Sequence, residues 1–173
     1  MKLAYPITIL LFIFFVFNTL YQHFSPKSAK SNRIACHQEV TTFERLYEPN
    51  KLQKVKQLLD SQDFKLNMNI AKSHYMPTRI DSYLSIKQLK QMLEKTFGVS
   101  KGKKLLVNVL LYENDKKDPK KKSPKAKLYE GYVQINFVID QKRIYSIQID
   151  YKDKMGEDIA KRIDCAFKSL DTL

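Results

Sequence analysis

Two cysteines, Cys36 and Cys165, are the residues of this 173-residue chain whose type and placement most directly predict chemistry. In an exported domain, an even pair of cysteines predicts a disulfide. The apolar stripe of a helix over 157–170 would consist of Ile159, Ile163, Ala166, Phe167 and Leu170. Cys165 falls off that stripe, so it is not needed to fill the core, and pairing with Cys36 is predicted. In the cytoplasm both would stay free thiols.

Other reactive side chains form no pattern that predicts a metal site or catalysis. Cys36 and His37 are adjacent, which strains a metal chelate, and no Cys-x-x-Cys or His-x-x-x-His motif lies nearby. The glycines and lysines of 98–104 have the wrong spacing for a phosphate loop. The three histidines have no acidic residue at a suggestive spacing. We therefore predict a non-enzyme that holds neither a metal nor a cofactor.

The chain is strongly basic, with a formal net charge of +13, and lysines concentrate between residues 116 and 127. These lysines are Lys116, Lys117, Lys120, Lys121, Lys122, Lys125 and Lys127. Such a loop could bind an acidic protein surface, a lipid headgroup or an anionic polymer, or it could simply keep the domain soluble. Nucleic acid is not expected, because no arginine or aromatic residue separates these cations.

Helices are predicted in the first half of the chain from apolar residues that recur every three or four positions. Val40, Phe43, Leu46 and Tyr47 predict a helix that ends at Pro49. A second helix is predicted from Asn50, with Leu52, Val55, Leu58 and Leu59 facing inward. After a short strand over 65–70, a third helix begins at the capping box of Ser85 and Gln88 and ends at Gly98.

The second half of the chain predicts three strands, over 105–113, 128–139 and 143–151, before the carboxy-terminal helix. The connection 140–142 is so short that the last two strands must form an antiparallel hairpin. Alternation places the apolar residues of this hairpin on one face. The other face, a possible partner surface, carries Gln134, Asn136, Ser146, Gln148 and Asp150.

These elements together predict an α+β fold with the order ααβαβββα. The sheet is expected to be antiparallel, with three to four strands and with helices on one face. An amino-terminal membrane helix is expected to precede this single small domain. The boundaries are a transmembrane signal anchor at 1–21, a polar linker at 22–35 and an extracytoplasmic domain at 36–173.

The membrane helix is predicted because residues 3–17 contain no charged side chain. A helix over 3–20 would measure roughly 27 Å at ~1.5 Å per residue, close to the ~30 Å hydrocarbon core of a bilayer. The alternative is a cleaved signal peptide, but the nearest small residues suited to cleavage, at 29–31, lie far downstream of the apolar run.

The orientation of this segment rests on opposing signals. Lys27, Lys30 and Arg33 after the segment, against Lys2 before it, favour a cytoplasmic domain. The short basic start followed by an apolar run, together with the cysteine pair, favours export. We therefore expect a single-pass membrane protein whose bulk is periplasmic or at the cell surface.

Three functions fit these features. The first is a membrane-anchored protein-interaction module of a cell-envelope assembly. The second is an immunity-like or inhibitor-like protein that binds an acidic secreted toxin or hydrolase. The third is a cytoplasm-facing basic domain that binds anionic lipid or nucleic acid, whose binding would weaken steeply with salt.

Overall fold

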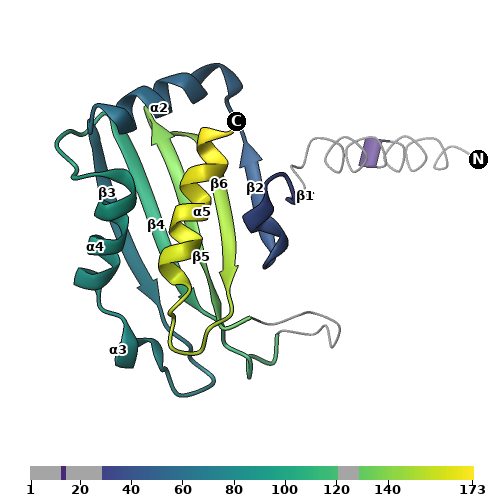
Figure 1. Ribbon diagram of the computed structural model, residues 1–173. Helices are drawn as coiled ribbons and strands as arrows, with labels where there is room; N and C mark the ends of the chain where they lie inside the picture. The colour runs from purple at the N-terminus through teal and green to yellow at the C-terminus, as the bar shows by residue number, and fades with distance from the viewer. Residues whose placement is uncertain (1–12, 15–28, 121–128) are drawn as a thin grey trace, which may run out of the picture.

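A computed structural model describes residues 13–14, 29–120 and 129–173, which form one mixed β-sheet with helices packed on one of its faces (Figure 1). The strands are β1 (Ala29–Lys30), β2 (Thr42–Leu46), β3 (Phe64–Ala71), β4 (Leu105–Glu113), β5 (Gly131–Ile139) and β6 (Lys142–Tyr151). The helices are α2 (Leu52–Asp60), α3 (Ile80–Tyr83), α4 (Ile86–Phe97) and α5 (Ile159–Asp171), with 3-10 turns η1 (Ala35–Gln38) and η2 (Pro49–Lys51). The strand order across the sheet is β1-β2-β6-β5-β4-β3.

The predicted fold class is wrong in its sheet and in its element order, although the α+β class and the one-sided helices are present. The described sheet has six strands rather than three to four, and it is not wholly antiparallel. β3 and β4 pair in parallel, from Phe64 opposite Leu105 to Ala71 opposite Tyr112. The connection between them carries α3 and α4 across the sheet, as a parallel pairing of consecutive strands requires.

The first predicted helix is also wrong, because that segment folds as a strand. β2 pairs antiparallel with β6, from Thr42 opposite Ile149 to Leu46 opposite Tyr145. The apolar spacing of Val40, Phe43 and Leu46 fits a helix, but pairing with β6 satisfies the backbone and overrides that local pattern. β1 adds a further short strand at the edge of β2, inside the range 22–35 predicted as a linker.

The helices α2 and α4 confirm the periodic pattern of the sequence. The four inward residues predicted for α2 are all buried. Ser85 and Gln88 form the predicted capping box of α4, and α4 ends at Gly98, whose φ is +84°. The buried stripe of α4 consists of Leu89, Leu93 and Phe97, whereas Ile86, the first residue of α4, is 46% exposed. The structure gives α2 no side-chain cap, because η2 leads directly into it.

The hairpin of β5 and β6 confirms the predicted connection and the predicted alternation. Asp140 and Gln141 both have positive φ, +50° and +62°, which suits a tight turn between twisted strands. The residues that face the helices are less than 3% exposed; they are Val133, Ile135, Phe137, Ile139, Tyr145, Ile147, Ile149 and Tyr151. A bulge between Phe137 and Val138 shifts the register by one residue on β6.

The segment before β2 is fastened to α5 by covalent and polar contacts. The predicted disulfide is present, and it joins Cys36 of η1 to Cys165 of α5 with their Cα atoms 6.0 Å apart. Arg162, whose side chain is 1% exposed, bonds Glu39 and Asp158, each at 2.9 Å. The strand β2 and its amino-terminal approach are therefore held against the carboxy-terminal helix.

Glu44 of β2 lies at the centre of a second polar cluster on the same side of the sheet. Its carboxylate accepts hydrogen bonds from Ser31, Arg33, Tyr145 and Ser169 at 2.5–3.0 Å. Burial by itself raises the pKa of Glu44, but these hydrogen bonds outweigh burial and lower the pKa to about 2.

Single-pass membrane localisation is corrected by the structure. In the parts of the chain that the structure describes, no helix is long and apolar enough to cross a membrane. The predicted signal anchor at 1–21 falls outside these parts, apart from the two helical residues 13–14. Residues 22–28 of the predicted linker also fall outside them.

Candidate partner-binding face of the sheet

The helices cover one face of the sheet, and in the described part of the chain no helix covers the other (Figure 1). We call this second surface the helix-free face. Strand alternation and pairing register define it by side chains of five strands and of Lys30. These residues are Lys30, Phe43, Arg45, Lys65, Asn67, Asn69, Ala71, Leu106, Asn108, Leu110, Tyr112, Tyr132, Gln134, Asn136, Val138, Arg143, Ser146, Gln148 and Asp150.

A row of polar side chains crosses the middle of the helix-free face, one from each of five neighbouring strands. The register places in one line Asn67, Asn108, Asn136, Ser146 and Arg45. Within this row, Asn67 donates to the side-chain oxygen of Asn108 at 2.9 Å, and Ser146 donates to that of Asn136 at 2.7 Å. The amides and the hydroxyl are therefore held in fixed orientations, as a recognition surface requires.

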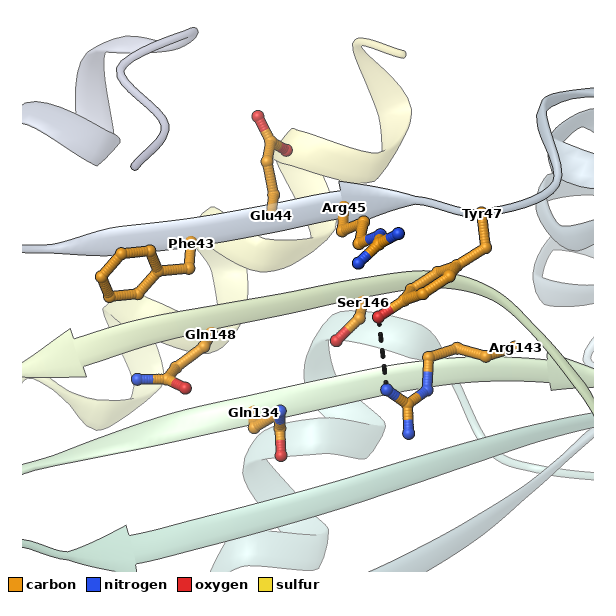
Figure 2. A pocket seen from close by; sticks show the side chains of 8 residues that line it. All are labelled: Phe43, Glu44, Arg45, Tyr47, Gln134, Arg143, Ser146 and Gln148. Carbon is orange, nitrogen blue, oxygen red and sulfur yellow. Dashed lines mark hydrogen bonds between the residues drawn. The ribbon is translucent and has the colours of Figure 1, made fainter. Parts of the chain in front are cut away.

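A groove of about 280 Å³ opens at the β2 side of this face. It is lined by Phe43, Glu44, Arg45, Tyr47, Gln134, Arg143, Ser146 and Gln148, and we call it the Tyr47 groove (Figure 2). The two glutamines and Ser146 project from neighbouring strands along its floor. The Glu44 side chain points to the other side of β2, so its carboxylate contributes no acceptor to the groove.

Two arginines flank the ring of Tyr47 in this groove. The Arg45 guanidinium carbon lies 4.5 Å from the ring centroid, and that of Arg143 lies 5.6 Å from it. Arg143 also donates to the Tyr47 hydroxyl at 3.3 Å, as the dashed line in Figure 2 shows. Stacking on an aromatic ring orders a guanidinium, and both arginines place their guanidiniums at one end of the groove.

The helix-free face is basic, like the chain as a whole. Its described side chains include four cations, namely Lys30, Arg45, Lys65 and Arg143, and the single carboxylate of Asp150. Burial raises the pKa of Asp150 to about 6, and a hydrogen bond from Gln148 opposes that effect. The carboxylate of Asp150, which carries the only negative charge among these described side chains, is therefore partly protonated in mildly acidic conditions.

The structure places all five residues of the predicted partner surface on the helix-free face. Gln134, Ser146 and Gln148 line the Tyr47 groove, whereas Asn136 lies in the polar row and Asp150 beyond the groove. The groove residues that β2 and its following turn contribute were not predicted, because the apolar spacing of this segment predicts a helix. The alternation of Phe43 and Arg45 with Thr42, Glu44 and Leu46 was the available signal.

The described part of the predicted lysine loop, residues 116–120, lies at the opposite end of the sheet from the arginines of the groove. It follows the carboxyl end of β4, where Glu113 pairs with Gly131, whereas Arg143 pairs with Val138 near the other end of β5. Lys116 is ion-paired with Glu130 at 2.5 Å, and Lys117 and Lys120 are exposed. The remaining predicted lysines, Lys121, Lys122, Lys125 and Lys127, lie outside the described residues.

Comparison with known proteins adds no family to this description. No family model, no curated protein and no solved structure matches the chain.

Proposed function

We propose that the chain is a non-catalytic protein-binding domain that docks an acidic segment of a partner protein on its helix-free face. The observation that carries the proposal is the Tyr47 groove, where two guanidiniums flank one aromatic ring above a floor of amides and a hydroxyl. Guanidinium groups bind carboxylates through paired hydrogen bonds. Amide side chains can both donate hydrogen bonds to a peptide backbone and accept them from it.

The composition of the face favours a peptide or protein over a lipid surface. Leu106, Leu110 and Val138 alternate with the polar row, so the face offers apolar contacts between fixed hydrogen-bonding groups. Arginine and tyrosine are enriched where protein partners bind most tightly, and a rim of scattered cations attracts an acidic segment before it docks. The disulfide suits a domain that works where thiols stay oxidised.

The test measures how the full chain binds a fluorescein-labelled peptide of glutamates with one central phenylalanine, by fluorescence anisotropy. The double variant Arg45→Gln, Arg143→Gln removes two positive charges from the groove. The matched control, Lys117→Gln with Lys120→Gln, removes two positive charges from the lysine loop. Charge-assisted hydrogen bonds contribute about 1.5–3 kcal/mol each, so the groove variant should bind at least about tenfold more weakly.

We expect the control variant to bind within about twofold of the wild-type chain at matched salt, because Lys117 and Lys120 lie away from the groove. Equal losses in both variants would mean that net charge alone attracts the peptide, and the proposal would fail. It would also fail if anionic lipid vesicles or single-stranded DNA bound the wild-type chain more tightly than the peptide. Circular dichroism of each variant checks that the fold is intact.

A further inference from the structure

The disulfide lies beside a buried histidine, and the three side chains together resemble a metal-binding cluster. Cys36 and His37 are neighbours in η1, and Cys165 reaches them from α5. One ring nitrogen of His37 and both sulfur atoms lie within 4.8 Å of one another. The His37 side chain is fully buried and Cys165 is 2% exposed, whereas Cys36 is half-buried and gives access from solvent.

Hydrogen bonds determine which nitrogen of His37 carries the proton. Ser31 has one hydroxyl proton and donates it to the Glu44 carboxylate, which can only accept. The contact of 3.0 Å between the Ser31 oxygen and His37 Nδ1 must therefore be donated by Nδ1–H. Nε2 then bears the lone pair of the neutral ring, and it is buried without a hydrogen-bond partner in the described part of the chain.

A buried lone pair without a partner is unfavourable, and such a group calls for an explanation, for example an ion that binds it. In metal sites, the ligating histidine characteristically donates its other N–H to an oxygen that fixes the ring, often within a chain that ends in a carboxylate. The chain from His37 through Ser31 to Glu44 has this arrangement. It holds the ring in the tautomer that a metal ion needs.

We propose that reduction of the Cys36–Cys165 disulfide creates a Zn²⁺ site formed by the two thiolates and Nε2 of His37. A small dithiol supplies the two electrons and two protons that convert the disulfide into two thiols, and the dithiol itself becomes a disulfide. Zn²⁺ then displaces both thiol protons to solvent. Two sulfurs and one imidazole nitrogen form a set of ligands typical of zinc, with a fourth position left for water.

The distances between the ligand atoms are close to those of a tetrahedral zinc site. Tetrahedral zinc, with bonds of about 2.3 Å to sulfur and 2.0–2.1 Å to nitrogen, places its ligand atoms roughly 3.5–3.8 Å apart. In the present cluster the three ligand atoms lie within 4.8 Å of one another, so the two bonded sulfurs must separate and the His37 nitrogen must move closer to them. No metal site was predicted from the sequence, because adjacent Cys36 and His37 were expected to strain the chelate. The turn of η1 instead brings both side chains to Cys165.

The test uses the full chain, oxidised or reduced with a phosphine, and Co²⁺ as a spectroscopic probe. We expect the reduced chain to bind one Co²⁺ with a thiolate-to-cobalt charge-transfer band and tetrahedral visible bands, and Zn²⁺ to remove both. The oxidised chain should show neither band. His37→Gln should weaken Zn²⁺ binding at least about tenfold, in line with the loss of one direct ligand. The matched control His74→Gln, at an exposed histidine, should leave affinity unchanged.

A second measurement covers the case in which reduction loosens the fold. Because a metal that binds the folded state stabilises it, Zn²⁺ should raise the thermal midpoint of the reduced chain and leave that of the oxidised chain unchanged. The proposal is overturned if reduced chain shows no charge-transfer band, if His37→Gln binds Zn²⁺ as tightly as wild type, or if both histidine variants lose affinity equally. Peptide binding at the Tyr47 groove is a separate result and does not bear on this outcome.

Discussion

Glu44 should make the stability of the domain strongly dependent on pH, and Glu44→Gln should remove the part of that dependence that Glu44 causes. The Glu44 side chain is 12% exposed and accepts hydrogen bonds from four side chains on β6, α5 and the segment before β2. The pKa of this carboxyl is lowered from its ordinary value of 4.5 to about 2. Since one pKa unit corresponds to ~1.4 kcal/mol, the ionised group contributes about 3 kcal/mol to the free energy of unfolding at pH 7.

The sign of the effect follows from the lowered pKa. A carboxylate whose pKa is depressed by folding stabilises the folded state above the unfolded value, near pH 4.5, and loses that contribution as the pH falls toward 2. Other carboxylates titrate in the same window; among them, Glu39 has its pKa lowered to about 2 by hydrogen bonds from Lys161 and Arg162. The difference between wild type and Glu44→Gln isolates Glu44, because the other groups are common to both.

The assay is urea unfolding followed by circular dichroism at pH values from 7 down to 2, with an unchanged slope as the check on two-state behaviour. We expect wild type to exceed Glu44→Gln by about 3 kcal/mol at pH 7, and the gap to close by about that amount near pH 2. Stability curves that run parallel over this range would refute the reasoning, because they would show that the charge of Glu44 contributes nothing.

Three further predictions concern the covalent link, the sheet and its polar face. Replacing both Cys36 and Cys165 by alanine removes a disulfide between residues 129 positions apart in sequence. The chain-entropy relation predicts that the free energy of unfolding, measured in urea, falls by about 5 kcal/mol. Adding a reductant should not destabilise this variant further. Gly131→Ala places a Cβ 2.0 Å from the Tyr112 carbonyl oxygen, so we expect the free energy of unfolding to fall by at least about 2 kcal/mol. The control variant Lys142→Ala, at an exposed residue, should change it by less than about 0.5 kcal/mol. Burial raises the pKa of Asp150 from 3.8 to about 6, so ionisation of this carboxyl destabilises the folded state as the pH rises through this range. Asp150→Asn should therefore raise the thermal midpoint of unfolding at pH 7 but not at pH 3.

The parts of the fold that the sequence predicted are those whose pattern is complete within one element. The stripe of Leu89, Leu93 and Phe97 has the helical period, and Ser85 with Gln88 marks the beginning of α4. The hairpin of β5 and β6 was predictable for the same reason, since two alternating runs joined by a few residues leave one arrangement.

The segment around Phe43 shows where local pattern is insufficient. Its apolar spacing fits a helix, but Thr42 to Leu46 pairs with a strand that begins about a hundred residues later. No residue pattern within the segment indicates that it pairs with β6. Because a helix was predicted here, half of the residues that line the Tyr47 groove could not be predicted. Arg45 and Tyr47 reach the helix-free face only when the segment is extended.

The sequence by itself determined the amphipathic helices, the hairpin and the pairing of the two cysteines, because residue type and spacing carry that information along the chain. Tertiary structure alone decided the parallel pairing of β3 with β4, the position of Arg143 beside Tyr47, and the burial of His37 against the disulfide. Each of these joins segments far apart in sequence, and such contacts form only where the burial of a shared core outweighs the entropy lost in closing the chain between them.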